Sequence, residues 1–303
     1  MNKNTVIYSY QDTNGYIQME EYSLFHGIKL MIHSVHTERM TRQNTEKGRI
    51  VEIYHCREGR MERVFEDSYY YLMPGDLALD VMDNGTKTFT FPLRHYHGIT
   101  ISINLDLAPK CFSCFLEDVN VKPSNIVEKL CDKQSCFVIR AKEYVEHLFS
   151  EMYSVPCENK KGYFKIKVLE LMLVLSGIDP NENKITSYTL SSSQVELAKV
   201  SAAFVAENID RTITVAAISK RFHVSPTHLQ NAFKGVFGVP VNSYIRIYKM
   251  NLAALQLVRT EKTIMEIANE CGYDNASKFA SAFRKIMNET PLEYRKKHRV
   301  FSL

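Results

Sequence analysis

Residues 214–234, TVAAISKRFHVSPTHLQNAFK, and residues 263–284, TIMEIANECGYDNASKFASAFR, repeat one pattern and decide the fold of the last third of the chain. Ile218 aligns with Ile267 and Phe233 with Phe283, and the offset grows from 49 to 50 residues between these two pairs. Repetition at a fixed period indicates that each copy is one supersecondary unit. We therefore expect two equivalent units within residues 194–303.

Each copy reads as a short helix, a tight turn and a second helix. Pro226 suits the first position of a helix because it lacks an N–H. Thr263-x-x-Glu266 is a capping box, and Gly272 permits the tight turn. This order of elements is the helix-turn-helix signature. The expected N-caps are Thr214, Ser225, Thr263 and either Asp274 or Asn275.

The second helix of each copy is predicted to bury an apolar stripe and to expose a polar face. Amide and hydroxyl side chains can hydrogen-bond base edges, whereas Lys and Arg contact phosphates. A competing interpretation is that both faces are merely solvated. The candidate DNA-contacting residues are Ser225, Thr227, Gln230, Asn231 and Lys234 in the first copy, and Asn275, Ala276, Ser277, Lys278, Ser281, Arg284 and Lys285 in the second.

The charge of the chain is asymmetric. Residues 191–303 hold 16 Lys and Arg against 9 Asp and Glu, a net +7, although the whole chain carries only +4. A basic segment attached to a slightly acidic remainder favours a polyanionic partner for that segment alone.

A helix between the two copies is predicted from the spacing of Ile245, Tyr248, Leu252, Leu255 and Val258. An 18-residue helix is about 27 Å long. Such a strut can hold two recognition helices about 34 Å apart, which is one turn of DNA. One chain would then reach two successive major grooves.

These two stretches, together with TPLEYR at residues 290–295, resemble the AraC/XylS family of bacterial transcription regulators. The resemblance implies a protein that binds double-stranded promoter DNA, most often an activator that recruits RNA polymerase. It places base contacts at Thr227, Gln230 and Asn231 in the first helix, and at Ala276, Ser277 and Ser281 in the second. These last three side chains are smaller than is common in the family, so the second helix is expected to position more than it specifies.

Two substitutions separate these roles. We expect Gln230→Ala to lower specific binding by about 1–3 kcal/mol and to relax sequence preference, and Arg284→Ala to weaken binding to all sequences alike. Gel-shift titrations on specific and scrambled sites measure both, and equal losses on both sites for Gln230→Ala would contradict the first expectation.

The first two thirds of the chain read as a second domain, residues 1–180. Short alternating runs separated by turn residues predict a β-barrel or sandwich over about 5–123, and apolar residues at helical spacing predict helices over about 124–178. Residues 181–193 are the expected linker. YLMPGDLAL at residues 71–79 resembles the cupin-like sensory domain of the same family, which implies binding of a small-molecule effector. The apolar faces of 141–152 and 164–175 either pack on the barrel or form a homodimer, and we expect the dimer.

Three histidines and one arginine are candidates for the effector pocket: His55, His95, His97 and Arg94. In the run after Pro92, His95 and His97 share a face with Ile99 and Ile101, which is expected to point into the barrel. Burial in the core, lining of a pocket and metal binding all remain open for these histidines. No carboxylate follows His97 at the spacing of a cupin metal site, so no metal and no cofactor are assigned.

The seven cysteines are expected to be reduced thiols. Cys111-Phe-Ser-Cys114, followed by Cys131 and Cys136, only loosely matches a zinc ribbon because the second pair is too widely spaced. Interleaved phenylalanines favour a core role.

Composition and motifs limit the remaining function classes. No apolar run reaches the roughly 20 residues that span a bilayer, and residues 1–16 are polar, so a cytoplasmic protein without a membrane partner is expected. No catalytic constellation is visible, so an enzyme is not expected. The alternatives are a regulator controlled by a protein partner without a small ligand, and a metal-binding cupin enzyme or sensor, or an alkyl-accepting repair protein, fused to a DNA-binding domain.

Overall fold

A computed structural model describes residues 5–12, 15–44, 46–65, 68–82, 85–109, 121–131, 136–140, 142–180, 189–211 and 213–298. The chain divides into two compact units, Met1–Thr189 and Leu190–Leu303. Within the described residues, no helix is both long enough and apolar enough to cross a bilayer.

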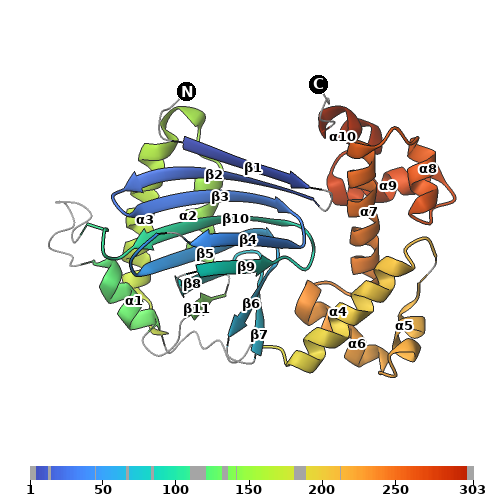
Figure 1. The fold of residues 1–303 in the computed structure, drawn as a ribbon, viewed down its shortest axis with the longest axis horizontal. Coiled ribbons are helices and arrows are strands. Elements are labelled where there is room, and N and C mark those ends of the chain that lie inside the picture. The colour runs from blue at the N-terminus through green and yellow to red at the C-terminus, as the bar shows by residue number, and fades with distance from the viewer. Residues whose placement is uncertain are drawn as a thin grey trace. The chain divides into compact units, whose positions relative to one another are not determined.

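The first unit contains two antiparallel sheets (Figure 1). The larger, sheet A, has the spatial order β1 (Thr5–Asp12), β2 (Gly15–Phe25), β3 (Ile28–His36), β10 (Tyr96–Asn104), β5 (Ile50–Gly59), β8 (Leu77–Met82) and β11 (Cys136–Ile139). The smaller, sheet B, has the order β4 (Arg39–Asn44), β9 (Gly85–Thr90), β6 (Met61–Phe65) and β7 (Ser68–Leu72).

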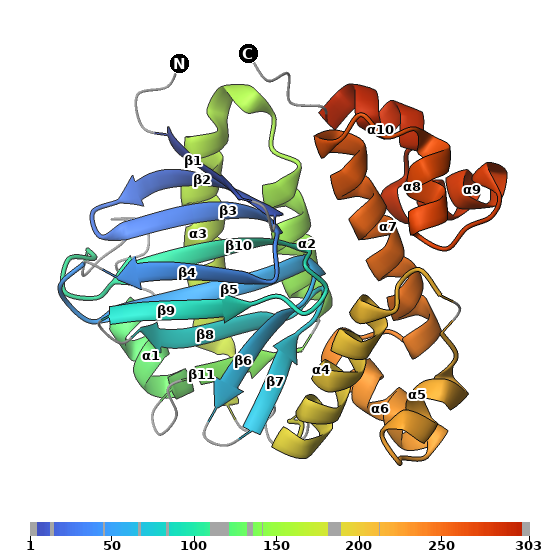
Figure 2. The same ribbon diagram turned by 45° about the vertical axis from the view of Figure 1, so that its right-hand side comes forward.

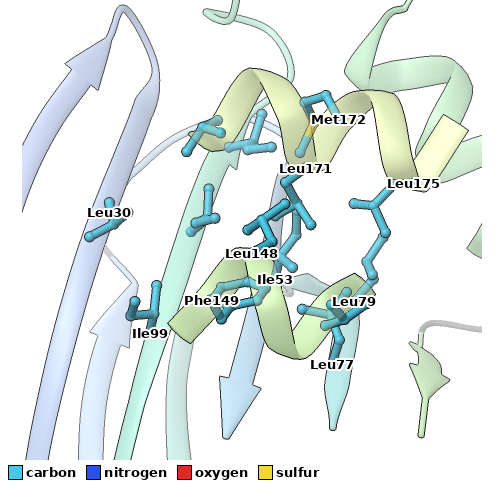
Figure 3. Close-up of a cluster of buried hydrophobic side chains, with 14 of the residues drawn as sticks. Leu30, Ile53, Leu77, Leu79, Ile99, Leu148, Phe149, Leu171, Met172 and Leu175 are labelled. Atoms are coloured by element: carbon cyan, nitrogen blue, oxygen red, sulfur yellow. The ribbon is translucent and has the colours of Figure 1, made fainter. Parts of the chain in front are cut away.

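Both faces of sheet A carry a hydrophobic core. One face packs against α1 (Pro123–Cys131), α2 (Glu143–Tyr153) and α3 (Lys160–Gly177), with the short helix η2 (Cys157–Asn159) before α3 (Figure 2). The core on this side joins strand residues such as Leu30 and Ile53 to Phe149 and Leu171 of the helices (Figure 3). The opposite face packs on sheet B through residues that include Tyr54, Phe89 and Tyr96. Sheet A is therefore the middle layer of three.

This layering corrects the predicted orientation of the histidine-containing strand. Ile99 and Ile101 of β10 face the helices, not a barrel interior. Tyr96, on the opposite side of the strand, faces sheet B. A single strand sequence cannot show that both of its sides are covered. The two sheets are established, whereas a closed cupin-like barrel stays a prediction.

The apolar helix faces have an intramolecular partner. Val145, Leu148 and Phe149 of α2 and Val168 and Leu171 of α3 are buried against sheet A. The interpretation that these faces form a dimer is therefore wrong, because the sheet already covers them. Helix α3 ends at Gly177, close to the predicted limit of about 178 for the helical region.

One strand was not expected. Residues 124–178 were predicted to be helical, yet Cys136–Ile139 forms β11 and pairs antiparallel with β8. A four-residue apolar run is compatible with either structure, and only its place beside the β8 edge decides for a strand.

The second unit is helical. Its elements are α4 (Ser192–Glu207), α5 (Val215–Arg221), α6 (Pro226–Phe237), α7 (Val241–Arg259), α8 (Ile264–Glu270), α9 (Ala276–Met287) and α10 (Pro291–His298). The boundaries follow the capping chemistry: the side chains of Thr214, Ser225, Thr263 and Asn275 each accept a backbone hydrogen bond at the start of a helix. These predicted N-caps are confirmed, with Asn275 and not Asp274 in the last case.

Candidate functional site

The repeated pattern folds into two equivalent helix-turn-helix motifs, α5–α6 and α8–α9. In each second helix the phenylalanines are buried and hold it in the unit, as Phe233 does in α6 and Phe283 in α9. An offset of 50 residues relates the exposed polar positions of the two helices: Thr227 to Ser277, Asn231 to Ser281 and Lys234 to Arg284. The two helices therefore present the same arrangement of hydroxyl, polar and cationic groups.

The repeat extends to the backbone of the turns. His223 (φ 54°) and Gly272 (φ 72°) both adopt the left-handed conformation, each between the two helices of its motif. Gly238 ends α6 and Asn288 ends α9 in that conformation as well. The two motifs therefore share left-handed residues at matching places, although the second turn is one residue longer than the first.

Gln230 has a structural contact that the sequence did not reveal. Its Oε1 accepts a hydrogen bond from the backbone N–H of Val241 at 3.2 Å, and its side chain is half-buried. Val241 is the first residue of α7, whose N-cap, Pro240, makes no side-chain capping bond. Gln230 therefore caps α7, and its amide nitrogen is left for other partners.

The other predicted contacts of the first helix are exposed. Thr227, Asn231 and Lys234 project from α6 into solvent. Ser225 is exposed too, but its hydroxyl accepts the N–H of His228 as the N-cap. Of the first set, Thr227, Asn231 and Lys234 carry side chains whose polar groups are presented on the open face.

The second helix is more basic. Ser277, Lys278, Ser281, Arg284 and Lys285 are exposed, and Ala276 is half-buried. The Asn275 side chain accepts the backbone N–H groups of Ser277 and Lys278 at 2.8 and 3.1 Å. Its oxygen is thus committed to the cap.

Helix α7 connects the motifs. It has 19 residues, which at 1.5 Å per residue makes it about 28 Å long. It packs on both α6 and α9. The helix predicted between the two copies is confirmed.

A separate feature of the first unit is a cleft between the sheets, with a volume of about 820 Å³. Sheet B has four strands against seven in sheet A, and β4 forms one edge of sheet B. Strands β1, β2 and β3 form one side of the cleft and β4 the other. A cavity of this size accommodates a small organic ligand.

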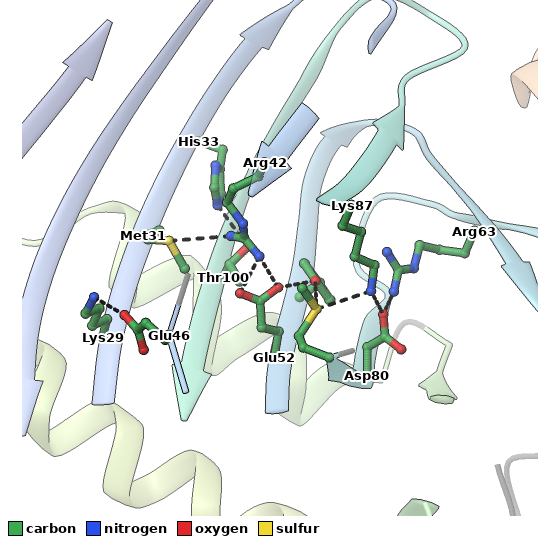
Figure 4. Close-up of polar contacts among 12 residues, drawn as sticks. Lys29, Met31, His33, Arg42, Glu46, Glu52, Arg63, Asp80, Lys87 and Thr100 are labelled. Atoms are coloured by element: carbon green, nitrogen blue, oxygen red, sulfur yellow. Dashed lines mark hydrogen bonds and ion pairs between the residues drawn. The ribbon is translucent and has the colours of Figure 1, made fainter. Parts of the chain in front are cut away.

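The cleft is lined by apolar side chains and by ion pairs. Met19, Met31 and Ile17 supply apolar surface. The Arg42 guanidinium of β4 pairs with the Glu52 carboxylate of β5 and so joins the two sheets, while Lys29 pairs with Glu46 at the edge (Figure 4). Such a mixture of apolar walls and fixed polar groups is typical of ligand pockets.

None of the four predicted pocket residues lines this cleft. His55 lies on the helix side of sheet A, where its ring stacks on Phe149 at 4.0 Å between centroids and its Nδ1 lies 3.1 Å from the Tyr153 hydroxyl. Burial lowers the pKa of His55 to about 3. Arg94 is half-buried and precedes β10 with φ 54°.

His95 and His97 do come together, and a third histidine joins them. His36, at the end of β3, places its Nε2 3.2 Å from Nε2 of His97. Burial lowers the pKa of His95, and it lowers that of His97 to about 4 with a further contribution from His95. His36 was not among the predicted residues, because the sequence does not indicate that β3 pairs with β10.

The cysteine cluster is only partly visible. Cys111 and Cys114 lie outside the described residues, and Cys131 is half-buried at the end of α1. Of the cysteines not considered in that cluster, Cys56 and Cys271 are buried and free.

The helical unit is similar in sequence to known proteins. A family model described as a helix-turn-helix domain matches residues 218–297. The regulatory protein SoxS of Escherichia coli (strain K12) is 33% identical over 93 residues, which cover 31% of this chain and 87% of that protein. The solved C-terminal domain of AraT, a response regulator from Geobacillus stearothermophilus, is 26% identical over 35% of this chain and 88% of that domain, with a TM-score of 0.34.

A longer but weaker match reaches into the first unit. The HTH-type transcriptional regulator YtdP of Bacillus subtilis (strain 168) is 23% identical over 230 residues, which are 70% of this chain and 29% of that protein. The chain thus spans less than a third of the length of this relative.

Two helix-turn-helix motifs joined by one helix define a DNA-binding regulator domain. The chain belongs to the AraC/XylS family of transcriptional regulators.

Proposed function

We propose that α6 and α9 enter two successive major grooves of double-stranded DNA and that α6 supplies most of the sequence readout. The observation that carries this proposal is that the exposed positions of the two helices are equivalent. Helix α7, which links them, is about 28 Å long, close to the roughly 34 Å of one DNA turn. Asn231 can form a bidentate pair with adenine, and Thr227 can contact either purine. Ser277 and Ser281 reach less far, so α9 acts mainly through phosphates.

Operators selected from random DNA by the purified chain test this proposal. Asn231→Ala should relax sequence preference within the selected site, whereas Lys234→Ala should weaken all sites and reduce the salt dependence of binding. Hydroxyl-radical footprinting of the selected site should show two protected stretches of backbone one helical turn apart, and protection of a single stretch would contradict insertion of both helices.

We further propose that the cleft between the sheets binds a small-molecule effector. Apolar walls together with the Arg39 guanidinium favour a ligand with an apolar body and an anionic group, since Lys29 and Arg42 are already paired with Glu46 and Glu52. Arg39 is exposed at the cleft, and its guanidinium makes no ion pair with a described residue. This assignment replaces the histidine pocket expected from the sequence.

Thermal-shift screening of the full chain identifies the effector, and two variants of β2 locate it. Met19→Trp places a bulky ring on the wall of the cleft and should reduce or abolish the shift. Gln18→Trp, an exposed neighbour that does not line the cleft, should leave it unchanged. Equal shifts in both variants would place the ligand elsewhere.

The remaining assignments are part of the same proposal. Residues 1–180 form a cupin-like sensory domain, residues 181–193 a linker and residues 194–303 the DNA-binding domain. The protein acts in the cytoplasm as a homodimeric activator that contacts RNA polymerase.

Ile166 (64% exposed) and Leu173 (36% exposed) on the outer side of α3 are apolar groups that a second copy can cover.

Sedimentation of the full chain at micromolar concentration tests the dimer. Ile166→Glu should shift the chain from dimer to monomer, because a buried unpaired carboxylate disfavours association. A native chain that sediments as a monomer contradicts the proposal.

A further inference from the structure

Three imidazole rings converge at one end of sheet A. The antiparallel register pairs Tyr96 of β10 with Val35 of β3. His95, the residue before Tyr96, therefore stands opposite His36, the residue after Val35. Because side chains alternate along a strand, His97 lies on the same face as His95 and is diagonal to His36. The sheet register itself therefore places all three rings together.

The separations suit one small ion. Ligand-capable atoms of His36, His95 and His97 all lie within 4.8 Å of one another, and the Nε2 atoms of His36 and His97 are 3.2 Å apart. In a tetrahedral zinc site with bonds of about 2.0–2.1 Å, neighbouring ligand atoms are about 3.3 Å apart. The ring centroids of the three histidines lie 4.7–5.2 Å from one another, so a modest rotation of His95 completes the set.

Neighbouring residues hold the rings in place. Nε2 of His95 lies 3.4 Å from a carboxylate oxygen of Glu58, which leaves Nδ1 of His95 for an ion. The ring of Tyr16 on β2 stacks on His36 with 4.4 Å between centroids. A carboxylate on the distal nitrogen of a ligating histidine is a common outer partner of metal sites.

We propose that His36, His95 and His97 bind one divalent transition-metal ion of the zinc class, with a fourth position open to water or to a small ligand. Imidazole nitrogen favours zinc, cobalt, nickel and copper, whereas magnesium and calcium require oxygen ligands. The three rings are half-buried, which leaves an approach from solvent. The site lies outside the residues that line the cleft, and it departs from the expectation that no metal is bound.

Titration of the metal-stripped full chain with Co²⁺ tests this site. We expect one ion per chain, intense visible bands of a four- or five-coordinate ion and displacement by Zn²⁺. Nuclear magnetic resonance of the Co²⁺-loaded chain should show three shifted exchangeable imidazole N–H signals, one from each ligand.

Variants assign the ligands. His36→Gln and His97→Gln should each lower affinity at least tenfold, and Glu58→Gln should lower it by about 10–100-fold through the outer partner. His147→Gln is the matched control because the side chain of His147 is 73% exposed on α2. Circular dichroism without metal checks that each variant is folded.

Three results overturn the proposal. One is the absence of a one-to-one Co²⁺ complex with such bands in the native chain, which requires no variant. Another is a thiolate-to-cobalt charge-transfer band, which would assign the ion to cysteines. The third is an affinity that is the same in the native chain, in folded His36→Gln and in folded His97→Gln.

Discussion

Single residues on α6 have different tasks although they share one helix. Gln230 faces both the exposed side and the start of α7, where it accepts the N–H of Val241. Asn231 is fully on the exposed side. The helical spacing of polar residues shows which face is polar, but not which polar group is already engaged within the protein.

Gln230→Ala is therefore expected to lower stability as well as DNA binding. Loss of the bond to Val241 should reduce the free energy of unfolding by about 0.5–1.5 kcal/mol. Asn231→Ala should change it by less than about 0.5 kcal/mol while still weakening specific binding. Urea unfolding of both variants measures this, and equal stabilities would remove the capping role of Gln230.

The left-handed turn positions allow a second residue-scale prediction. At Gly272, with φ 72°, a Cβ atom would come 3.1 Å from the carbonyl oxygen of Asp210. Gly272→Ala should lower the free energy of unfolding by about 1–2 kcal/mol. The control is Gly162→Ala in α3, where nothing lies within 4 Å and stability should rise by up to about 1 kcal/mol. Unfolding curves in which both variants match the native chain would contradict the strain argument.

At the scale of elements, an amphipathic helix must bury its apolar face against another surface. The sequence of the helix does not specify which surface that is. Helices α2 and α3 have the apolar spacing of a dimerisation segment, yet sheet A takes that face. The apolar spacing predicts that this face is buried, but it does not determine which surface buries it.

Substitutions on two sides of α3 measure this assignment. Leu171 is fully buried, so Leu171→Ala should lower the free energy of unfolding of the first unit by about 2–5 kcal/mol, independent of protein concentration. Ile166→Ala, on the exposed side, should cost less than about 0.5 kcal/mol in the monomer. If the cost of Leu171→Ala varied with protein concentration, the face would instead belong to an interface between chains.

At the scale of the whole molecule, burial of neutral histidines makes stability depend on pH. Burial lowers the pKa of both His33 and His55 to about 3, with a contribution from the Arg42 guanidinium for His33. In the unfolded chain these rings titrate near pH 6.5. Below that value the unfolded state binds protons that the native state does not, so stability is complete above pH 6.5 and falls as pH decreases toward 3.

His55→Gln should reduce this slope. Each buried histidine contributes up to about 1.4 kcal/mol per pH unit to the pH dependence of the free energy of unfolding. Between roughly pH 6 and 4.5, the variant should lose the contribution of one histidine. Urea unfolding at several pH values provides the measurement, with exposed His147→Gln as the control. A slope unchanged by His55→Gln would mean that His55 titrates normally in the folded chain.

The sequence alone predicted most of the helical unit, because its signals are local. Caps such as Ser225 and Thr263 act within one helical turn, and the duplicated pattern reports the second motif from the first. The backbone hydrogen bonds that close the turns, from His223 N–H to Lys220 and from Gly272 N–H to Asn269, are local as well.

The first unit was decided by tertiary structure, because strand pairing joins residues far apart in the chain. The meeting of His36 with His95 and His97 depends on β3 lying beside β10, and the cleft depends on residues of β1 to β3 in sheet A lining it together with residues of β4 in sheet B. A strand's own pattern records that its side chains alternate, but the free energy that selects its neighbours comes from packing across the whole layer. Local capping chemistry thus determined the DNA-binding motifs, whereas long-range register decided every candidate ligand site.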